Sequence, residues 1–456
     1  MSYIRNHLYF FNAFVFLLFI LHVFWPHPVL IALIGALGMV MVVLNFALAD
    51  RVFKIIGVIL LSAGIFFFSS SSESLTSIPG FFAENIGLLF LISMLPWMNS
   101  VVKAGRYNQL LQGLLGSSGR QSLGSLYVRS QATMVSLAAF LNLTSVIISQ
   151  DLLVNQLKTL PGKVRNRFIF LTTLRGYSMA LPWSPLEVLL VTAVFVTGVN
   201  FLSILPWMIL IAVLGFIVDA SIGKWRFRNE WLEESSTSRP GQSVPKKKLA
   251  AFITGLVLFL AAVVFVANVL QFDFLFAVTI TIFPFAWIWA VIMKRSKSFL
   301  KLGWPSWVSQ TNHLSNFIVL LVPLSFFTES LNVSPYLDYL QQPIVALDGH
   351  PLLIMLFIQF TFLVMTLLGI HPLAVMGIFG GITGLLMETM PTVTLTVLLA
   401  SCAIATVSSA PYGLIITMTS VRLRVNPYRI VLTNLPYSLI YGFIGVLVSL
   451  LTLQFY

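Results

Sequence analysis

The sequence predicts an all-α protein that crosses a membrane about 11 times and carries two re-entrant hairpins, arranged as two inverted repeats. Three observations predict this fold class. The first is composition: 58% of the 456 residues are hydrophobic and 9% are charged, more apolar surface than a soluble chain of this length could bury. The second is the distribution of basic residues between the apolar runs. The third is a break of the same kind in two long apolar runs.

Composition also excludes some partners. The net charge of +12 would suggest nucleic acid in a soluble protein, but here it fits lysine and arginine gathered in cytoplasmic loops. We therefore expect a lipid bilayer around the chain and no nucleic acid. The single cysteine, Cys402, excludes intramolecular disulfides. The first apolar run ends at "WPHP" without a small-residue cleavage site, which favours a retained helix over a signal peptide.

Placing the N-terminus in the cytoplasm puts the clusters of lysine and arginine on one side of the membrane. The first four apolar runs then alternate across the bilayer, since a spanning helix needs about 17–25 residues. They cover residues 8–24, 29–48, 55–70 and 82–98. Continuing this count places the C-terminus outside. The expected location is a bacterial cytoplasmic membrane.

The region 131–157 does not fit a single crossing. It has basic residues at both ends, Arg129 before it and Lys158 after it, and "NLTS" at its centre. One crossing would strand one basic cluster outside, whereas a re-entrant hairpin keeps both inside. Such irregular backbone is tolerated where it is buried in protein or lines a cavity. A second hairpin, 350–388, is predicted to enter from the outside with "GIHP" at its tip.

These assignments divide the chain into two repeats that follow an extra N-terminal span at residues 1–28. The first repeat, 29–221, comprises spanning helices (29–98), an interfacial arm (99–127), a hairpin (131–157), a broken helix (168–199) and a final helix (202–221). A cytoplasmic linker (222–248) leads to the second repeat, 249–456, with spanning helices (249–330), a hairpin (350–388), a broken helix (391–420) and a final helix (430–452).

Spacing supports the match between the halves. From Asn142 at one predicted tip to Pro182 in one break is 182 − 142 = 40 residues, and from His371 to Pro411 is 411 − 371 = 40. The stretch "LPWSP" also lines up with "SAPYG". Inverted halves whose discontinuous helices meet near the midplane are typical of secondary transporters.

A helix that begins in mid-membrane presents unpaired N–H groups and a positive dipole end, which together bind anions. At the first break, Ser184 is a candidate N-cap, Pro185 fits the first helical position and Glu187 follows as in a capping box. We expect similar chemistry at the second break and at both tips, and one cavity where the four helix starts converge. The predicted solute-binding residues are Asn142, Thr144, Ser145, Pro182, Ser184, Gly369, His371, Ser408, Ser409 and Pro411.

Charged residues in apolar runs are candidates for ion coupling, because such residues are usually functional. Glu187 either couples a proton or cation or serves the capping box, and Asp151 is a similar case. Arg175 either extends to the cytoplasmic face or supplies positive charge to an anionic substrate. His371 is either a proton-sensitive ligand or a helix cap.

The chain resembles the ion transporter superfamily in its inverted halves, its hairpins and the broken stretches "GYSMALPWSPLEV" and "TVSSAPYGLIITM". This superfamily includes divalent anion/sodium symporters, arsenite and citrate carriers and the membrane subunits of TRAP transporters. The resemblance covers essentially the whole chain as architecture. It implies a homodimer and an elevator mechanism in which hairpins and broken helices move against the scaffold helices, 29–98 and 249–330. The divalent anion symporters carry Ser-Asn-Thr at both tips, where this chain has "NLTS" and "GIHP".

The sequence contains no nucleotide-binding loop, no metal-spaced Cys/His cluster and no nucleophile beside a plausible base, so we expect no enzyme and no metal site. A hydrolase or lipid-modifying enzyme with an intramembrane site that uses His371 and Ser409 is a further alternative. The leading hypothesis is a secondary active transporter for a small anionic solute, coupled to Na+ or H+ and needing no other cofactor. A flippase or exporter of a lipid-linked or amphipathic anion is the main alternative, and a channel is the third.

Overall fold

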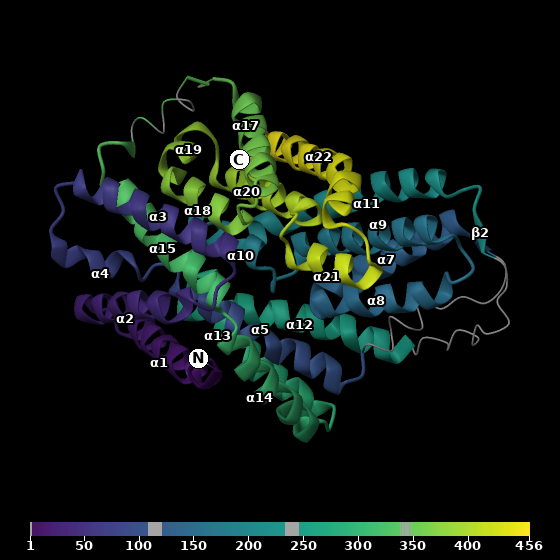
Figure 1. The fold of residues 1–456 in the computed structure, drawn as a ribbon, viewed down its shortest axis with the longest axis horizontal. Coiled ribbons are helices and arrows are strands. Elements are labelled where there is room, and N and C mark those ends of the chain that lie inside the picture. The colour runs from purple at the N-terminus through teal and green to yellow at the C-terminus, as the bar shows by residue number, and fades with distance from the viewer. Residues whose placement is uncertain are drawn as a thin grey trace.

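The computed structural model describes residues 2–107, 121–232, 246–337, 339, 342, 346–347 and 349–456. This part of the chain is helical apart from one antiparallel pair of two-residue strands, β1 (Gln121–Ser122) and β2 (Trp231–Leu232) (Figure 1). Ten of its helical segments are long and apolar enough to cross a membrane, or up to 12 if each of two bent pairs is one span. The prediction of an all-helical, multi-spanning protein is confirmed.

One group of helices comes from the start of each half. It consists of α1 (Ser2–Phe24), α2 (Pro28–Phe46), α3 (Arg51–Ser69), η1 (Leu75–Ser77), α4 (Ile78–Phe81), α5 (Ile86–Ala104), α12 (Lys246–Leu270), α13 (Phe274–Ile292), α14 (Ser296–Asn312) and α15 (Ser315–Asn332). Helix α3 packs along α15, and α5 packs on α13 and α14. The first contact is close, because a Cβ added at Gly57 would lie 2.6 Å from the carbonyl oxygen of Val319.

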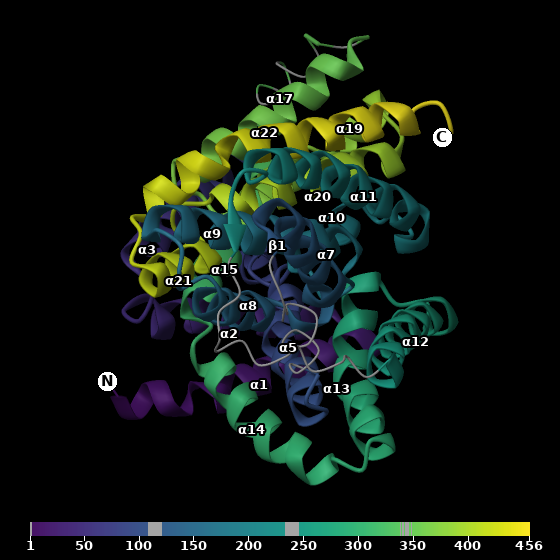
Figure 2. The same cartoon turned by 90° about the vertical axis from the view of Figure 1, so that its right-hand side faces the viewer.

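The second group contains the predicted hairpins and broken helices. It consists of α7 (Leu123–Leu141), α8 (Leu143–Gln156), α9 (Gly162–Ala180), η2 (Leu181–Trp183), α10 (Val188–Thr197), α11 (Phe201–Arg226), α17 (Pro351–Leu367), α18 (Pro372–Gly381), α19 (Thr383–Thr389), α20 (Thr392–Thr406), η3 (Val407–Ser409), α21 (Leu414–Leu423) and α22 (Pro427–Thr452). Figure 2 shows α11, α20 and α22 toward the top and α12, α13 and α14 toward the bottom.

Two reversals bring paired helices together. Helices α7 and α8 meet at Asn142, whose φ of 44° is unusual for a residue other than glycine. Helices α17 and α18 meet at the segment from Gly369, with φ of 96°, to His371. A Cβ at Gly369 would also lie 2.9 Å from the ring of Tyr412. Conformation and crowding therefore both require glycine there.

The two breaks have the same local geometry. A 3-10 turn (η2 or η3) ends each first half-helix, and a four-residue β-turn follows. In the first turn the N–H of Glu187 donates to the carbonyl of Ser184, and in the second the N–H of Gly413 donates to that of Ala410. Proline is the second residue of both turns, where its fixed φ is favourable. Each break packs against the last helix of its own half, η2 on α11 and η3 on α22.

This geometry corrects the predicted helix starts. Helix α10 begins at Val188 with Glu187 as its N-cap, so Ser184 caps no helix and Pro185 lies in the turn instead. The residue that corresponds to Pro411 is therefore Pro185, not Pro182. The tip-to-break separations become 185 − 142 = 43 and 411 − 371 = 40, so the predicted equal spacing is wrong.

The helix starts at the second break and the first tip also differ from expectation. Helix α21 begins after Gly413, so neither Ser408 nor Ser409 caps it. Helix α8 is capped by Asn142 rather than by Thr144 or Ser145. At the second break the turn adds residues between the two serines and the start of α21, whereas Thr144 and Ser145 lie inside α8, after its cap. Parts of the predicted interfacial arm and linker, residues 108–120 and 233–245, lie outside the described residues.

Candidate functional site

A cavity of about 270 Å³ lies where both hairpin tips and both breaks meet the first group of helices. The tips contribute Asn142 and Leu143 on one side and residues 369–373 on the other. The first break contributes residues of the segment that runs from α9 into α10, and the second break contributes residues of the segment that runs from η3 into α21. Helices α3, α5, α14 and α15 close the cavity with Val52, Phe53, Ile92, Leu95, Gln310 and Phe317. The convergence predicted from sequence is thus a property of the structure.

The first tip is held to the first broken helix by Asn142. Its side-chain oxygen accepts hydrogen bonds from the N–H of Leu143, at 2.7 Å, and from the hydroxyl of Tyr177, at 2.7 Å. Both acceptor positions of the amide oxygen are therefore used.

Glu187 places a carboxyl group in the cavity wall at the end of the first turn. The residue is 9% exposed, and one of its carboxyl oxygens accepts a hydrogen bond from the N–H of Leu189 at 3.4 Å. The residues that line the cavity include no lysine or arginine. A buried carboxylate without a cation is costly, so this position favours a group that exchanges a proton.

The second tip presents an aromatic surface. The Nδ1 atom of His371 accepts a hydrogen bond from the N–H of Leu373 at 3.2 Å, so the imidazole caps α18, and Pro372 occupies the first helical position. The ring centroid of His371 lies 6.0 Å from that of Phe317 and 6.5 Å from that of Phe53. The helix-capping interpretation of His371 therefore matches the geometry, and the ring still borders the cavity.

Of the predicted binding residues, Asn142, Gly369 and His371 line the cavity, and so does the coupling candidate Glu187. The serines of the breaks make other contacts. The hydroxyl of Ser184 donates to the carbonyl of Ala139 at 2.7 Å and ties the first break to α7.

The remaining predicted residues lie beside the cavity rather than in its wall. Ser408 and Ser409 share hydrogen bonds with Ser438 of α22, at 3.3 and 2.9 Å. Ser145 donates to the carbonyl of Asn142 at 2.6 Å. Pro182 is buried in η2. Pro411 shapes its turn, and Thr144 lies in the first turn of α8.

The other two charged candidates are paired with partners away from the cavity. Arg175 donates to Asp219 at 2.6 Å and to the side-chain oxygen of Asn434 at 2.9 Å. Both members of the Arg175–Asp219 ion pair are almost fully buried. Asp151 on α8 forms an ion pair with Arg422 on α21 at an exposed position. Neither charge faces the cavity.

Sequence reasoning missed several lining residues. Tyr177 and Tyr412 lie within the two broken stretches, so their aromatic hydroxyls were available as a signal. Gln310, Phe53 and Phe317 come from helices far away in the sequence, and nothing local marks them. Within the described residues no group of three His, Cys, Asp or Glu could hold a metal ion.

The fold is similar to those of two solved membrane proteins. The YdaH transporter of Alcanivorax borkumensis aligns with a TM-score of 0.58 at 15% identity, covering 89% of this chain and 98% of that one. MtrF of Neisseria gonorrhoeae, described as illuminating a class of antimetabolite efflux pumps, aligns with a TM-score of 0.54 at 12% identity, covering 89% and 94%. No protein-family model matches the sequence, and no curated protein matches it. At these identities the likeness establishes the fold, and it is a fold of transport proteins rather than of enzymes.

Proposed function

We propose that this protein is a secondary active transporter that moves a small anionic organic solute across the cytoplasmic membrane together with protons. The observation that carries the proposal is the one cavity built jointly by both tips, both breaks and the first group of helices. A site shared between two groups of helices can open to either side when one group moves against the other. The similarity to YdaH and MtrF supports the same class. We extend the proposal to the elevator movement and homodimer that the superfamily resemblance implies.

The start of α21 is the proposed place for the anionic group. Three of the four helix starts are capped by their own side chains, those of Asn142, Glu187 and His371. Helix α21 starts at Gly413 without a side-chain cap, and Gly413, Leu414 and Ile415 all line the cavity. Free N–H groups and the positive dipole end would bind a carboxylate or similar anion there.

Glu187 is the proposed coupling group. An anionic solute and an ionised Glu187 would place two negative charges in a cavity without a cation among its lining residues. Protonation of Glu187 removes this repulsion, so binding of the anion and binding of a proton favour each other. Na+ remains the alternative coupling ion and is tested below.

The size and lining of the cavity favour a small solute with an apolar part. Its volume of about 270 Å³ lies at or below the range of about 300–1,000 Å³ for pockets that hold drug-sized ligands. Phe53, Phe317 and Leu95 offer an apolar surface opposite the helix starts. A lipid-linked substrate would need a larger space, so we favour the transporter over the flippase.

The test is thermal stabilisation of the purified protein by a panel of small organic anions at two pH values, with and without Na+. An anion present at a hundred times its dissociation constant should add about 2.7 kcal/mol to the stability. We expect stabilisation to be stronger at the lower pH in the wild type and independent of pH in Glu187→Gln. Stabilisation that depends on Na+ and not on pH would refute proton coupling.

A matched pair of variants tests the anion position. Gly413 has φ −64° and ψ 140°, which any residue adopts. A Cβ there would lie 3.1 Å from the carbonyl oxygen of Ala410, a contact that Gly413→Asp and Gly413→Ala share, so the two variants differ by the carboxylate. We expect Gly413→Asp to abolish stabilisation by anions and Gly413→Ala to keep most of it. Thr144→Ala, outside the cavity wall, should bind like the wild type. Equal anion affinity in the aspartate and alanine variants would place the anion elsewhere.

A further inference from the structure

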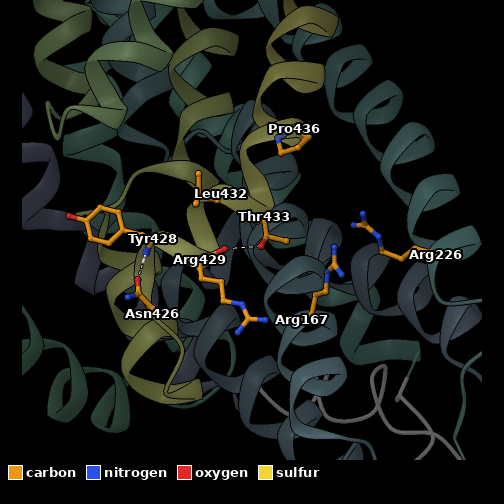
Figure 3. A pocket seen from close by; sticks show the side chains of 8 residues that line it. All are labelled: Arg167, Arg226, Asn426, Tyr428, Arg429, Leu432, Thr433 and Pro436. Atoms are coloured by element: carbon orange, nitrogen blue, oxygen red, sulfur yellow. Dashed lines mark hydrogen bonds between the residues drawn. The ribbon is translucent and has the colours of Figure 1, made fainter.

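A second, strongly basic hollow lies apart from the solute cavity, at the ends of α9, α11 and α22. Arg167, Arg226 and Arg429 project into it from these three helices, and its volume is about 670 Å³ (Figure 3). Asn426, Tyr428, Leu432, Thr433 and Pro436 complete its wall. None of its lining residues is shared with the solute cavity. We call this hollow the basic groove.

The three arginines are not neutralised by protein groups. All three side chains are exposed, and within the described residues none of them forms an ion pair with an acid. Arg167 lies within electrostatic range of both Arg226 and Arg429, so like charges repel across the groove. The described residues that line it include no acidic residue. Folding thus places three positive charges around one hollow, where a bound anion would offset their repulsion.

The positive region continues to the start of α9. An adjoining hollow of about 600 Å³ shares Arg167, Asn426, Arg429 and Thr433 with the basic groove and adds Lys163 and Arg424, again without an acidic residue. Gly162, the first residue of α9, lines it, and the preceding Pro161 provides no side-chain cap. The N–H groups of this helix start therefore add to the positive potential.

In the other direction the groove becomes apolar. A narrow hollow of about 100 Å³ shares Arg226, Thr433 and Pro436 with it and runs between α11 and α22. Ile222, Ile440 and Ile444 line this part, and its one acid, Asp219, is already bound to Arg175. Leu432, Ile222 and Ile440 are all exposed. A charged end joined to an apolar channel between membrane-spanning helices matches the shape of a phospholipid.

We propose that the basic groove binds the phosphate headgroup of an anionic phospholipid, with an acyl chain along α11 and α22. Guanidinium groups bind phosphate oxygens through paired hydrogen bonds, and basic pockets between spanning helices on the cytoplasmic side suit such headgroups. The groove lies at the end of the molecule that carries Lys163, Arg226 and Arg424, the end expected to face the cytoplasm. One lipid there bridges three helices of the second group.

The experiment uses the full-length protein, freed of lipid in an uncharged detergent. Short-chain phosphatidylglycerol is titrated while the thermal unfolding midpoint is recorded, with phosphatidylcholine of the same chain length, glycerol phosphate and inorganic phosphate in parallel. We expect phosphatidylglycerol alone to raise the midpoint at low concentration. Each of Arg167→Gln, Arg226→Gln and Arg429→Gln should weaken its apparent affinity about fivefold, and the triple variant should abolish the shift.

Arg228→Gln is the matched control. Arg228 follows the same helix, α11, but lies over the ring of Trp225 and does not line the groove, so its removal should leave the affinity unchanged. A triple lysine variant keeps the charge and should keep most of the lipid effect, which separates charge from folding. Equal stabilisation by phosphatidylcholine, by glycerol phosphate or by inorganic phosphate would overturn the proposal. An equal loss in Arg228→Gln would overturn it as well.

Discussion

Removing the carboxylate of Asp219 should destabilise the second group of helices more than any change at the solute cavity. Asp219 on α11 accepts hydrogen bonds from Arg175 on α9, at 2.6 Å, and from the hydroxyl of Tyr127 on α7, at 2.7 Å. The carboxylate of Asp219 also accepts a hydrogen bond from the side-chain amide nitrogen of Gln131, which lies on α7 like Tyr127, at 2.5 Å. One buried carboxylate therefore joins three helices.

The expected loss of stability follows from the groups that Asp219→Ala would leave without a partner. Arg175 would keep its bonds to Asn434 and the carbonyl of Thr433 but would carry a buried, uncompensated charge. Breaking a buried ion pair by removing one partner costs about 3–5 kcal/mol. Asp219→Asn retains an acceptor without the charge, and it should cost about 1.5–3 kcal/mol, the worth of one hydrogen bond to a charged group.

The double variant Arg175→Met/Asp219→Leu separates the charge from the network. It removes both ions, so the uncompensated charge disappears, while Tyr127 and Gln131 still lose their acceptor. We expect its stability to fall between those of the wild type and Asp219→Ala. Equilibrium unfolding in mixed micelles gives the free energies of unfolding for the complete cycle.

The prediction has a clear refutation. A free energy of unfolding for Asp219→Ala within 1 kcal/mol of the wild type, an order-of-magnitude threshold for an exposed pair, would mean that water or another group compensates Arg175. A double variant less stable than Asp219→Ala would show that the guanidinium contributes through its contacts with Asn434 and the Tyr437 ring rather than through its charge.

Two further predictions concern the tips. Tyr177→Phe removes the hydrogen bond to Asn142, so the free energy of unfolding should fall by about 0.5–1.5 kcal/mol, with a matching change in solute affinity, whereas Tyr456→Phe at an exposed position should change neither. Gly369→Ala forces a left-handed conformation on alanine and a contact with Tyr412, which should cost at least about 1–2 kcal/mol in thermal unfolding experiments; an unchanged midpoint would contradict the backbone geometry.

Local sequence patterns predicted those parts of the site that depend on neighbouring residues. The cap at His371 could be expected, because an imidazole before Pro372 satisfies the first free N–H of α18. The start of α10 could not be predicted from sequence, because Ser184, Pro185 and Glu187 fit both a capping box and a proline turn. Tertiary contacts favour the turn: η2 packs against α9, α11 and α20, and the hydroxyl of Ser184 donates to the carbonyl of Ala139 on α7. In the second half, a glycine in place of Glu187 was the available signal that the two breaks differ in chemistry.

The pairing of Arg175 shows what longer-range contacts add. In sequence, Arg175 has two plausible roles, and neither is the observed one, because its partner is 44 positions away on another helix. A signal existed: Asp219 is the one acid in the apolar stretch of α11, as Arg175 is the one base in the later part of α9. Lone opposite charges in neighbouring spans pair to avoid the cost of burial. This pairing leaves Glu187 as the acid at the cavity.

The difference between the two breaks gives the cavity its polarity. Both share a proline turn, but the first ends in Glu187, which puts a negative group at the start of α10, and the second ends in Gly413, which leaves the start of α21 uncapped. A symmetric pair of uncapped starts would bind anions with no link to protons. A symmetric pair of carboxylates would repel them. Under the proposed function, one of each lets a bound anion raise the affinity of Glu187 for a proton, which is the coupling that a proton-driven transporter of anions requires.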